Sequence, residues 1–473
     1  MKISHLIQGI DKIEIRGKQS VEISGLSSDS RVVAPGDLFI AKKGIKRDGA
    51  VYIPQAVNAG AKAVVTDVYN PFIPILQIIH PFPHTIEAKL AARFYGEPAK
   101  QLRTIGVTGT KGKTTTTYLI RHMLEKMGEK CGLLGTIEMS IGDFCFPSDR
   151  TTKDPISNQK WLKEMVMQKC HTAILEVSSH GLEQGRVGEI PWDVGVFTNL
   201  YADHLDYHPT IEHYAAAKAK LFTQVRGTSV LNIDNSWAQK MKVQGNVLSF
   251  GIQEKADLQA SGIHITEEGI RFSVGDVPFF VPIVGMFNVY NVLSAVGVGV
   301  ARGYPLQALS ESLADFPGVP GRLERVPNTK GIHIFVDYAH TGEALCEVLK
   351  TLRGFAKKKI IVVFGCGGER DPGRRPKMAE AAEQYADIAV ITNDNPRSED
   401  PEKICREILV GFTTLSRVVI ELDRAAAIGR AIALAEPQDI VIIAGKGHEK
   451  IQIFSHQTVI FDDIEVAGKV CSS

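Results

Sequence analysis

The chain has 473 residues, of which 44% are hydrophobic and 23% charged, and this composition excludes a disordered, collagen-like or coiled-coil protein. One hydrophobic core rarely extends over so long a chain, so we expect about three domains at roughly 150 residues each. The 54 lysines and arginines nearly balance the 53 acidic residues, and the net charge of +1 gives no reason to expect a nucleic-acid partner.

The cysteines and the apolar runs indicate the cellular compartment in which the protein is expected. Seven cysteines without a CxxC pair argue against a disulfide framework or a zinc ribbon, so we expect reduced thiols. Gly9 and Asp11 interrupt the apolar N-terminal stretch, which argues against a signal peptide. The longest apolar runs, such as 360–364, are far shorter than the roughly 20 residues that cross a bilayer. We expect a cytoplasmic protein without membrane insertion, and a monomer.

The first 98 residues differ from the rest of the chain. They contain short strand-like runs, turns at 34–36 and 48–49, and a proline-rich stretch, NPFIPILQIIHPFPH, at 70–84. Proline and glycine interrupt regular structure at such positions. The sequence predicts an N-terminal domain over residues 1–98, with its boundary near Glu97-Pro98.

Strand-like and helical stretches then alternate. The expected strands of the central region are 102–107, 172–177, 193–198 and 228–233. Runs rich in β-branched residues are typical of strands that are buried on both faces, as in parallel sheets covered by helices. Thr114 to Met127 predicts a helix with one apolar face, ended by Gly128.

A second boundary is expected in DFPGVPGRLERV, at 315–326, where two prolines and two glycines interrupt the pattern. Beyond it the expected strands are 334–337, 359–364, 388–391, 417–420 and 439–443, and a helix from Arg424 is closed by Pro437. The sequence therefore predicts a three-domain α/β protein, with a mostly parallel central sheet over 99–320 and a third domain over 321–473.

The clearest motif is Gly106-Val-Thr-Gly109-Thr-Lys-Gly112-Lys113-Thr114, which follows a strand and opens a helix. Glycines allow backbone N–H groups to surround phosphate, the helix N-terminus and Lys113 favour negative charge, and the Thr114 hydroxyl can bind Mg²⁺. The loop departs from the usual GxxxxGK[ST] pattern, because Val107 stands where that pattern has glycine. The motif predicts binding of Mg²⁺ with ATP or GTP.

Two other segments place polar residues at strand ends. Glu176 ends one expected strand and Asp203-His204 follow another, and ligands of doubly wound sheets bind at such ends. Glu176 could instead cap a helix, and His204 could be a hydrogen-bonded turn residue. Lys218 and Lys220 lie in an expected helix, and their spacing alone predicts only solvated lysines.

Ten ordered segments together resemble the Mur ligase family of ATP-dependent amide-bond ligases. The segments are GVTGTKGKTTTT, EVSSHGLEQGRV, FTNLYADHLDYH, AAAKAKLF, GMFNVYNVLSA, GVPGRLERV, FVDYAHT, VFGCGGERD, NDNPR and AGKGHEK. The resemblance implies an N-terminal UDP-binding domain, a central P-loop-type ATPase domain and a C-terminal Rossmann-like domain. It is strongest to the branch that adds meso-diaminopimelate to UDP-N-acetylmuramoyl-L-alanyl-D-glutamate in peptidoglycan precursor synthesis.

The resemblance also assigns roles to residues. ATP would phosphorylate the substrate carboxylate, and the amine would then displace phosphate from the acyl phosphate. Lys113, Glu176, His204 and Lys218 are the catalytic candidates, with Thr114, Glu176 and His204 as Mg²⁺ ligands and Lys218 as a carbamylated lysine. The residues that match the family's ATP contacts are Gly109, Thr110, Lys111, Gly112, Lys113, Thr114, Thr115, Asn291, Arg322 and Asp337.

The two other substrates would meet two further groups of residues. Those that match contacts to the UDP-muramoyl peptide are Ser28, Ser30, Arg31, Thr151, Thr152, Ser178, Gln184 and Arg186. Those that match contacts to diaminopimelate are Arg370, Asp394, Asn395, Pro396, Arg397, Gly445 and Glu449. Glu369 and the run 341–343 depart mildly from the family pattern, and neither removes a proposed contact.

Three alternatives stay open from the sequence. A lysine-adding relative would use the same chemistry, but its motif usually lacks an arginine at the position of Arg397. A folate polyglutamylating ligase shares the central fold, but the segments SDSR and DNPR do not suit it. A P-loop ATPase that remodels a partner would need no second substrate for phosphate release.

Overall fold

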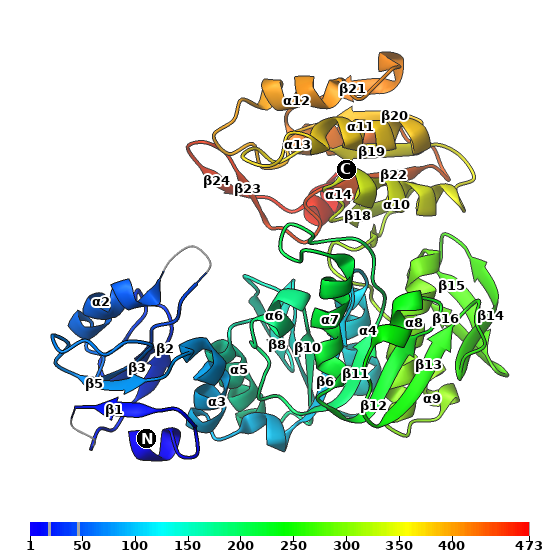
Figure 1. The fold of residues 1–473 in the computed structure, drawn as a ribbon. Helices are drawn as coiled ribbons and strands as arrows, with labels where there is room; N and C mark the ends of the chain where they lie inside the picture. The colour runs from blue at the N-terminus through cyan, green and yellow to red at the C-terminus, as the bar shows by residue number, and fades with distance from the viewer. Residues whose placement is uncertain (18–19, 45–47, 473) are drawn as a thin grey trace. The chain divides into compact units, whose positions relative to one another are not determined.

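The computed structural model describes residues 1–17, 20–44 and 48–472 (Figure 1). The chain forms two compact units, which are described separately below. The first comprises 1–259 and 293–305, and the second comprises 260–292 and 306–473. Within the described ranges, no helix is long and apolar enough to cross a membrane.

The first unit begins with a five-stranded sheet in the order β1-β5-β4-β3-β2, in which only β1 runs antiparallel to its neighbour. Apolar residues of the sheet, such as Leu38 and Ile78, are fully buried together with Leu90 of α3 in a core near the N-terminus. The elements are α1 Ile3–Leu6, β1 Glu14–Arg16, β2 Gly25–Ser27, β3 Asp37–Ile40, α2 Ile53–Asn58, β4 Ala63–Thr66, β5 Leu76–Ile79 and α3 Pro83–Phe94.

A second, larger sheet of this unit holds the phosphate loop. Its parallel strands lie in the order β7-β10-β6-β11-β12-β13, and β8 and β9 extend it antiparallel beyond β7. The bounds are β6 Arg103–Thr108, β7 Cys131–Leu134, β8 Glu138–Ile141, β9 Phe144–Pro147, β10 Thr172–Glu176, β11 Trp192–Phe197, β12 Val225–Asn232 and β13 Asn246–Gly251. Register pairs Glu176 with Val107 and Phe197 with Thr108, so three strands end at one level.

Helices cover this sheet. The apolar face predicted for the helix after the phosphate loop is confirmed, since Leu119, Ile120, Met123 and Leu124 of α4 are fully buried, and Gly128 follows the helix at φ +83°. Gly106 matters for packing, because a Cβ there would lie 2.9 Å from Cε3 of Trp192. The helices are α4 Lys113–Lys126, α5 Pro155–Met167, α6 Ser179–Glu183 and α7 Ile211–Phe222.

The chain passes between the units three times: within β14, within α8, and between α8 and α9. β14 (Leu258–Ile265) starts parallel to β13 in the first unit, and its later residues pair with β15 (Ile270–Val274) in the second unit. β16 (Val277–Val281) follows β15 as an antiparallel partner. The helices nearby are α8 Met286–Ala301 and α9 Leu306–Leu313.

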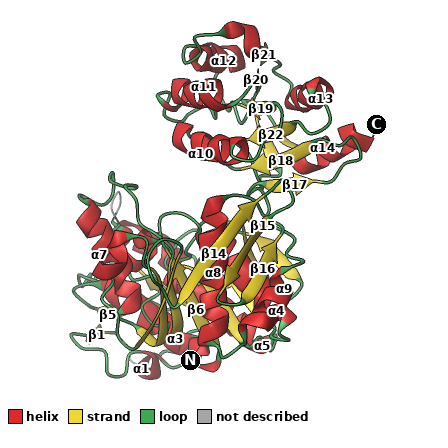
Figure 2. Ribbon diagram, turned by 90° about the vertical axis from the view of Figure 1, so that its right-hand side faces the viewer, coloured by secondary structure: helices red, strands yellow, loops and turns green. Residues whose placement is uncertain are grey.

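The second unit contains a sheet in the order β17-β18-β22-β19-β20-β21, parallel except for β17. Figure 2 shows this sheet with α10, α11 and α12 on one side and α13 and α14 on the other. The elements are β17 Glu324–Val326, β18 His333–Asp337, α10 Gly342–Arg353, β19 Ile360–Phe364, α11 Arg374–Tyr385, β20 Ile388–Ile391, α12 Pro401–Leu409, β21 Val418–Ile420, α13 Arg424–Leu434, β22 Ile440–Ala444, β23 Ile451–Ile453, β24 Thr458–Ile460 and α14 Asp463–Ser472. All the strands predicted for this region are present.

Candidate functional site

The phosphate loop connects β6 to α4, in the strand–loop–helix context that the sequence predicts. Gly112 precedes α4 at φ +85°, and Gly109, at φ +155°, leaves no space for a side chain because its Cβ would lie 1.9 Å from Oγ1 of Thr198. Lys111 N donates to Oδ1 of Asn199 over 2.9 Å, which ties the loop to the end of β11. Lys113 Nζ donates to the carbonyl oxygens of Gly109 and Thr110, both at 2.9 Å. Lys113 therefore links the start of α4 back to the loop that precedes it.

Glu176 lies directly beside this loop. Its carboxylate is only 1% exposed, and it accepts from Oγ1 of Thr114 at 3.0 Å and from N and Oγ1 of Thr136 at 2.9 and 2.8 Å. Within the described part of the chain, the hydrogen bonds to the Glu176 carboxylate come from Thr114 Oγ1 and from Thr136, and none comes from a helix N–H group, so they do not support the capping alternative. Oγ1 of Thr136 also lies 3.0 Å from Oγ1 of Thr151.

The Thr114–Glu176 pair has the chemistry of a magnesium site. Mg²⁺ prefers hard oxygen ligands and often takes one or two protein side chains, with substrate phosphates and water completing the octahedron. A buried hydroxyl and a carboxylate in contact fit that description. Among the described residues, no group of three or more His, Cys, Asp and Glu side chains is placed to hold a metal ion by itself.

Lys218 is buried, in contrast to the solvated lysine that its spacing suggests. Its side chain is 1% exposed, Nζ donates to the carbonyl oxygen of Gly109 at 2.8 Å, and Nζ lies 4.4 Å from the centre of the Tyr214 ring. Burial, and next the charge of Lys113, hold the pKa of Lys218 well below its ordinary value. The Lys218 amine therefore lies buried next to the phosphate loop, where its protonated form is disfavoured.

His204 lies in an exposed turn after β11. Its backbone is left-handed at φ 54°, its side chain is 49% exposed, and Nε2 is 3.7 Å from Oδ2 of Asp203. In the part of the chain that the structure describes, no hydrogen bond or ion pair joins His204 to Thr114 or Glu176. A role as a metal ligand stays a prediction.

The segment expected to meet the muramoyl peptide is brought together at the start of α6. Thr152 Oγ1 donates to the carbonyl oxygen of Glu176 and accepts from N of Ser178, both at 2.9 Å. Ser178 Oγ accepts from N of Gly181 and thereby caps α6. Arg186 donates to Oε1 of Gln184 at 2.6 Å and to the carbonyl oxygen of Thr152 at 2.8 Å. Hydrogen bonds, most of them to backbone groups, thus link Thr152, Ser178, Gln184 and Arg186 into one segment.

The N-terminal segment SDSR lies at the end of β2. Ser30 Oγ donates to Oε1 of Gln55 at 2.9 Å. The Arg31 guanidinium is 81% exposed and pairs with Asp29, whose pKa it lowers through a hydrogen bond. Ser28 is half-buried. Arg31 therefore forms a surface ion pair, and its contact with UDP stays a prediction.

Three residues expected to meet ATP belong to the second unit. Asn291 is buried and donates to Oδ1 of Asn288 at 2.8 Å. Arg322 lies over the Tyr338 ring, 5.3 Å from its centre. Asp337 accepts from N of Leu323 and N of Ala339, both at 2.8 Å, and burial raises its pKa. Their contact with a nucleotide stays a prediction.

The amino-acid candidates of the second unit converge after β20 and β22. Asn395 Nδ2 donates to Oε2 of Glu449 at 2.9 Å, and its Oδ1 accepts from Nζ of Lys446 at 3.1 Å. Lys446 Nζ is fully buried and also lies 3.1 Å from Oε2 of Glu449. Asp394 is 8% exposed, and burial raises its pKa. Gly445, at φ +113°, leaves room for Asp394, because a Cβ at position 445 would lie 2.7 Å from Oδ2 of Asp394.

Arg397 borders the same group of residues. It follows the buried Pro396, has a left-handed backbone at φ 53°, and uses Nη1 to donate to the carbonyl oxygen of Gly368 at 2.7 Å. Gly368 N in turn donates to the carbonyl oxygen of Asn395 at 2.9 Å. Arg370 is exposed, two residues beyond Gly368 in the same loop. The loops 365–370 and 393–397 are thus hydrogen-bonded to each other.

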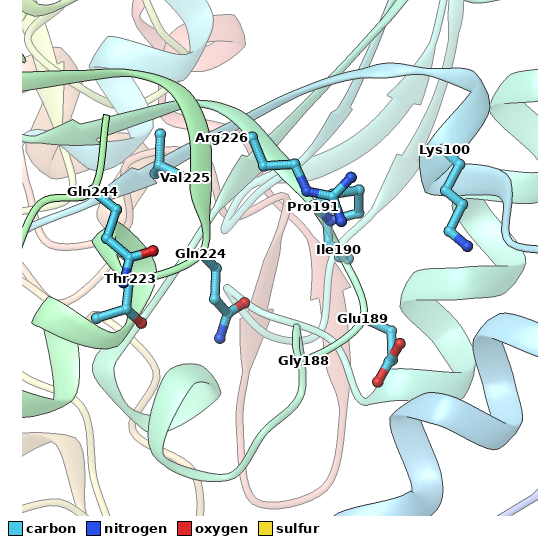
Figure 3. A pocket seen from close by; sticks show the side chains of 10 residues that line it. All are labelled: Lys100, Gly188, Glu189, Ile190, Pro191, Thr223, Gln224, Val225, Arg226 and Gln244. Atoms are coloured by element: carbon cyan, nitrogen blue, oxygen red, sulfur yellow. The ribbon is translucent and has the colours of Figure 1, made fainter. Parts of the chain in front are cut away.

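A cavity of about 340 Å³ lies at the amino-terminal ends of β11 and β12, opposite the ends that lie near the phosphate loop (Figure 3). Lys100, Glu189, Gln224 and Arg226 are among the residues that line it. None of the residues singled out from the sequence lines it.

Several residues of the site escaped the sequence analysis. Thr136 lies in a turn between β7 and β8, and nothing in its surroundings distinguishes its hydroxyl from others. Lys446 does lie within the segment AGKGHEK, so its position could have drawn attention. Arg424, at the start of α13, forms a fully buried ion pair with Asp463. It also donates to the carbonyl oxygens of Asn393 and Ala444, and so stabilises the loops that follow β20 and β22.

Comparison with known proteins covers nearly the whole chain. Three family models match: "Mur ligase family, catalytic domain" over 22–94, "Mur ligase middle domain" over 107–299 and "Mur ligase, glutamate ligase domain" over 321–447. Two relatives, from Geobacillus thermodenitrificans and Chlamydia felis, are named UDP-N-acetylmuramoyl-L-alanyl-D-glutamate–2,6-diaminopimelate ligase, and each is 41% identical to this chain. The match to the Geobacillus protein covers 99% of this chain and 98% of the relative. The match to the Chlamydia protein covers 100% of both chains.

Solved structures agree with the sequence relatives. A UDP-N-acetylmuramoyl-L-alanyl-D-glutamate–2,6-diaminopimelate ligase superposes with a TM-score of 0.73 at 32% identity over 98% of both chains. MurF ligase of Thermotoga maritima, solved in complex with ADP, has the same fold, with a TM-score of 0.63 at 20% identity over 94% of this chain and 96% of its own. The predicted three-domain α/β class is confirmed, and the chain belongs to the Mur ligase family.

Proposed function

We propose that the protein uses ATP to join meso-diaminopimelate to UDP-N-acetylmuramoyl-L-alanyl-D-glutamate, and releases ADP and phosphate. The full-length similarity to ligases that carry this activity in their names supports the proposal most strongly. The reaction supplies a peptidoglycan precursor, on which cell shape and division depend. We place the protein in the cytoplasm as a monomer, and we keep 1–98, 99–320 and 321–473 as its domains.

The reaction depends more on neutralising the negative charge of the phosphate groups than on covalent catalysis by the protein. The γ-phosphoryl group passes from ATP to the free carboxylate of the glutamyl nucleotide, and the amine then displaces phosphate through a tetrahedral intermediate. Loop amides of 109–114 and the Lys113 ammonium are suited to hold the transferring phosphoryl group. Thr114 and Glu176 would hold Mg²⁺, with His204 as a candidate for a second ion. The bound ion supplies further neutralisation of the phosphate charge.

We propose that Lys218 is modified to a carbamate. A neutral amine can attack CO₂, form an N–C bond and lose one proton, which leaves –NH–COO⁻. The depressed pKa of Lys218 favours the neutral amine that this step requires. The product is an anion beside the phosphate loop, where it can support Mg²⁺. Burial of the free ammonium between Gly109 and Tyr214 is otherwise unfavourable.

Lys218→Ala is expected to lower kcat by about 10- to 100-fold, as losses of groups that support a metal site do. Short carboxylic acids, such as acetate, should restore part of the activity, since they can occupy the vacated space and replace the anion. Lys220→Ala is the matched control, because Lys220 is two residues away on the exposed side of α7. Full activity of Lys218→Ala without added acid would exclude the carbamate.

The amino-acid site suits a substrate with two charged ends. Asp394 and Glu449 can accept from an ammonium group, and Arg397 can bind a carboxylate with two parallel N–H donors. Lysine lacks the second carboxylate. The arrangement therefore supports diaminopimelate over the lysine-adding alternative.

The test is product formation with a panel of diamino acids. Purified protein, ATP, Mg²⁺ and the glutamyl nucleotide are incubated with meso-diaminopimelate, its isomers or lysine, and products are identified by mass spectrometry. Phosphate release should require both the nucleotide and the amino acid. Release of phosphate without either substrate would favour an ATPase that is not a ligase.

A further inference from the structure

His208 is the buried end of an otherwise exposed turn. Residues 201–206, which include His204, are all exposed, whereas the His208 side chain is 0% exposed. The turn begins where Tyr201 N donates to Oγ1 of Thr110 at 3.0 Å, and it ends where His208 N donates to the carbonyl oxygen of His204 at 2.9 Å. The position of His204 therefore depends on how these two ends are held.

Both ring nitrogens of His208 have partners on other elements. Nε2 lies 3.0 Å from Oγ of Ser179, the first residue of α6, which is 2% exposed. Nδ1 lies 3.2 Å from Nδ1 of His213 in the first turn of α7. Two facing Nδ1 atoms bond only when one ring presents N–H and the other a lone pair, so the two rings must carry complementary protonation at Nδ1. His208 thus connects the turn, α6 and α7.

The two helices carry different parts of the proposed site. α6 starts directly after Ser178 and ends directly before Gln184, in the segment proposed to bind the muramoyl peptide. α7 carries Lys218. Tyr207, the neighbour of His208, accepts from Nε2 of Gln184 at 3.2 Å, which is a second link from the turn to the substrate segment.

We propose that His208, through its bond to Ser179, is a positioning residue that holds the muramoyl-peptide segment of α6 in register with the His204 turn and α7. This inference rests on the proposed function, because it concerns the nucleotide substrate of that reaction. It requires the bond to act on the affinity for the nucleotide and to leave the affinity for ATP nearly unchanged.

The test is a double-mutant cycle. Ser179→Ala removes the hydroxyl, and His208→Phe keeps a ring of similar size without hydrogen bonds. Each is expected to raise KM for UDP-N-acetylmuramoyl-L-alanyl-D-glutamate by about five- to tenfold, the effect of one lost hydrogen bond, with KM for ATP changed less than about twofold. The double variant should be no worse than the poorer single variant, since both remove the same bond.

Two further variants distinguish positioning from folding. His208→Gln places an amide near the position of Nε2 and should recover most of the nucleotide affinity. Glu183→Gln breaks the more exposed ion pair to Lys220, at 2.7 Å, between the same two helices, and should change KM less than about twofold. Partial unfolding would lower kcat through loss of active enzyme and leave KM unchanged.

Calorimetric binding of the nucleotide without ATP gives a readout that does not depend on turnover. A wild type that neither binds nor converts the nucleotide would overturn the proposed function. A wild type that binds it, together with Ser179→Ala binding equally well, would overturn the role of His208. Additive losses in the double variant would do the same. If His208→Phe fails to fold, Ser179→Ala and His208→Gln still decide the question.

Discussion

Lys113→Ala is expected to reduce kcat/KM by about two to three orders of magnitude, with the fold intact. The ammonium lies 2.9 Å from two carbonyl oxygens of the phosphate loop and at the N-terminus of α4. A phosphoryl group bound by the loop would meet this charge at the point where negative charge accumulates. Removal of one such electrostatic stabiliser costs about 3 kcal/mol or more in transition-state stabilisation. Steady-state assays with both substrates measure the loss.

Lys126→Ala is the matched control for Lys113→Ala. It removes the same charge from the same helix, but at the far end of α4, where the residue is exposed. We expect the control to keep its turnover within about twofold, since a surface charge at a helix end contributes only a few tenths of a kcal/mol. Near-normal turnover of Lys113→Ala itself would remove the lysine from the mechanism.

Arg397→Ala is expected to lose most activity with diaminopimelate and most discrimination against lysine. Nη1 of Arg397 donates a hydrogen bond to the carbonyl oxygen of Gly368. Within the described ranges, no hydrogen bond involves Nε or Nη2 of Arg397. These donors can bind the distal carboxylate. With lysine bound, the guanidinium would be partly desolvated without a partner, which costs about 2–5 kcal/mol, or roughly 30- to several-thousand-fold in selectivity.

Arg397→Lys separates charge from geometry at this position. An ammonium cannot reproduce two parallel hydrogen bonds, so this variant should recover little of the selectivity. The measurement is the ratio of kcat/KM for diaminopimelate to kcat/KM for lysine in the wild type and in both variants. An unchanged ratio in Arg397→Ala would return the lysine-adding relative to consideration.

The sequence predicted the parts of the fold that depend on local pattern. Predicted strands start and end within three residues of those observed in the larger sheet of the first unit and in the sheet of the second, and α4 begins one residue earlier than expected. The strands that were not predicted include the parallel strands β7 and β13 and the antiparallel strands β8, β9, β15, β16 and β17. They are short, and their apolar residues alternate too briefly to distinguish a strand from a turn-rich segment.

Burial separates Lys218 from Lys220, and the helical spacing contains the signal for it. Tyr214, Leu221 and Phe222 lie four before, three after and four after Lys218, on one apolar face that the structure buries. The tertiary structure buries Ala217, Lys218 and Ala219 and leaves Ala216 and Lys220 exposed. Family resemblance, and not spacing, directed the prediction to Lys218, whose role stays a prediction.

The burial of Asp394 has a thermodynamic consequence for capture of the amino acid. Its raised pKa means that, over part of the acidic range, the carboxyl keeps a proton that an exposed aspartate would have lost. An arriving ammonium group favours the ionised form, so the proton passes to the buffer as the substrate binds. Affinity should then rise with pH over this interval. The apparent enthalpy of binding should vary linearly with the ionisation enthalpy of the buffer. The slope of that line gives the number of protons released per molecule of amino acid bound.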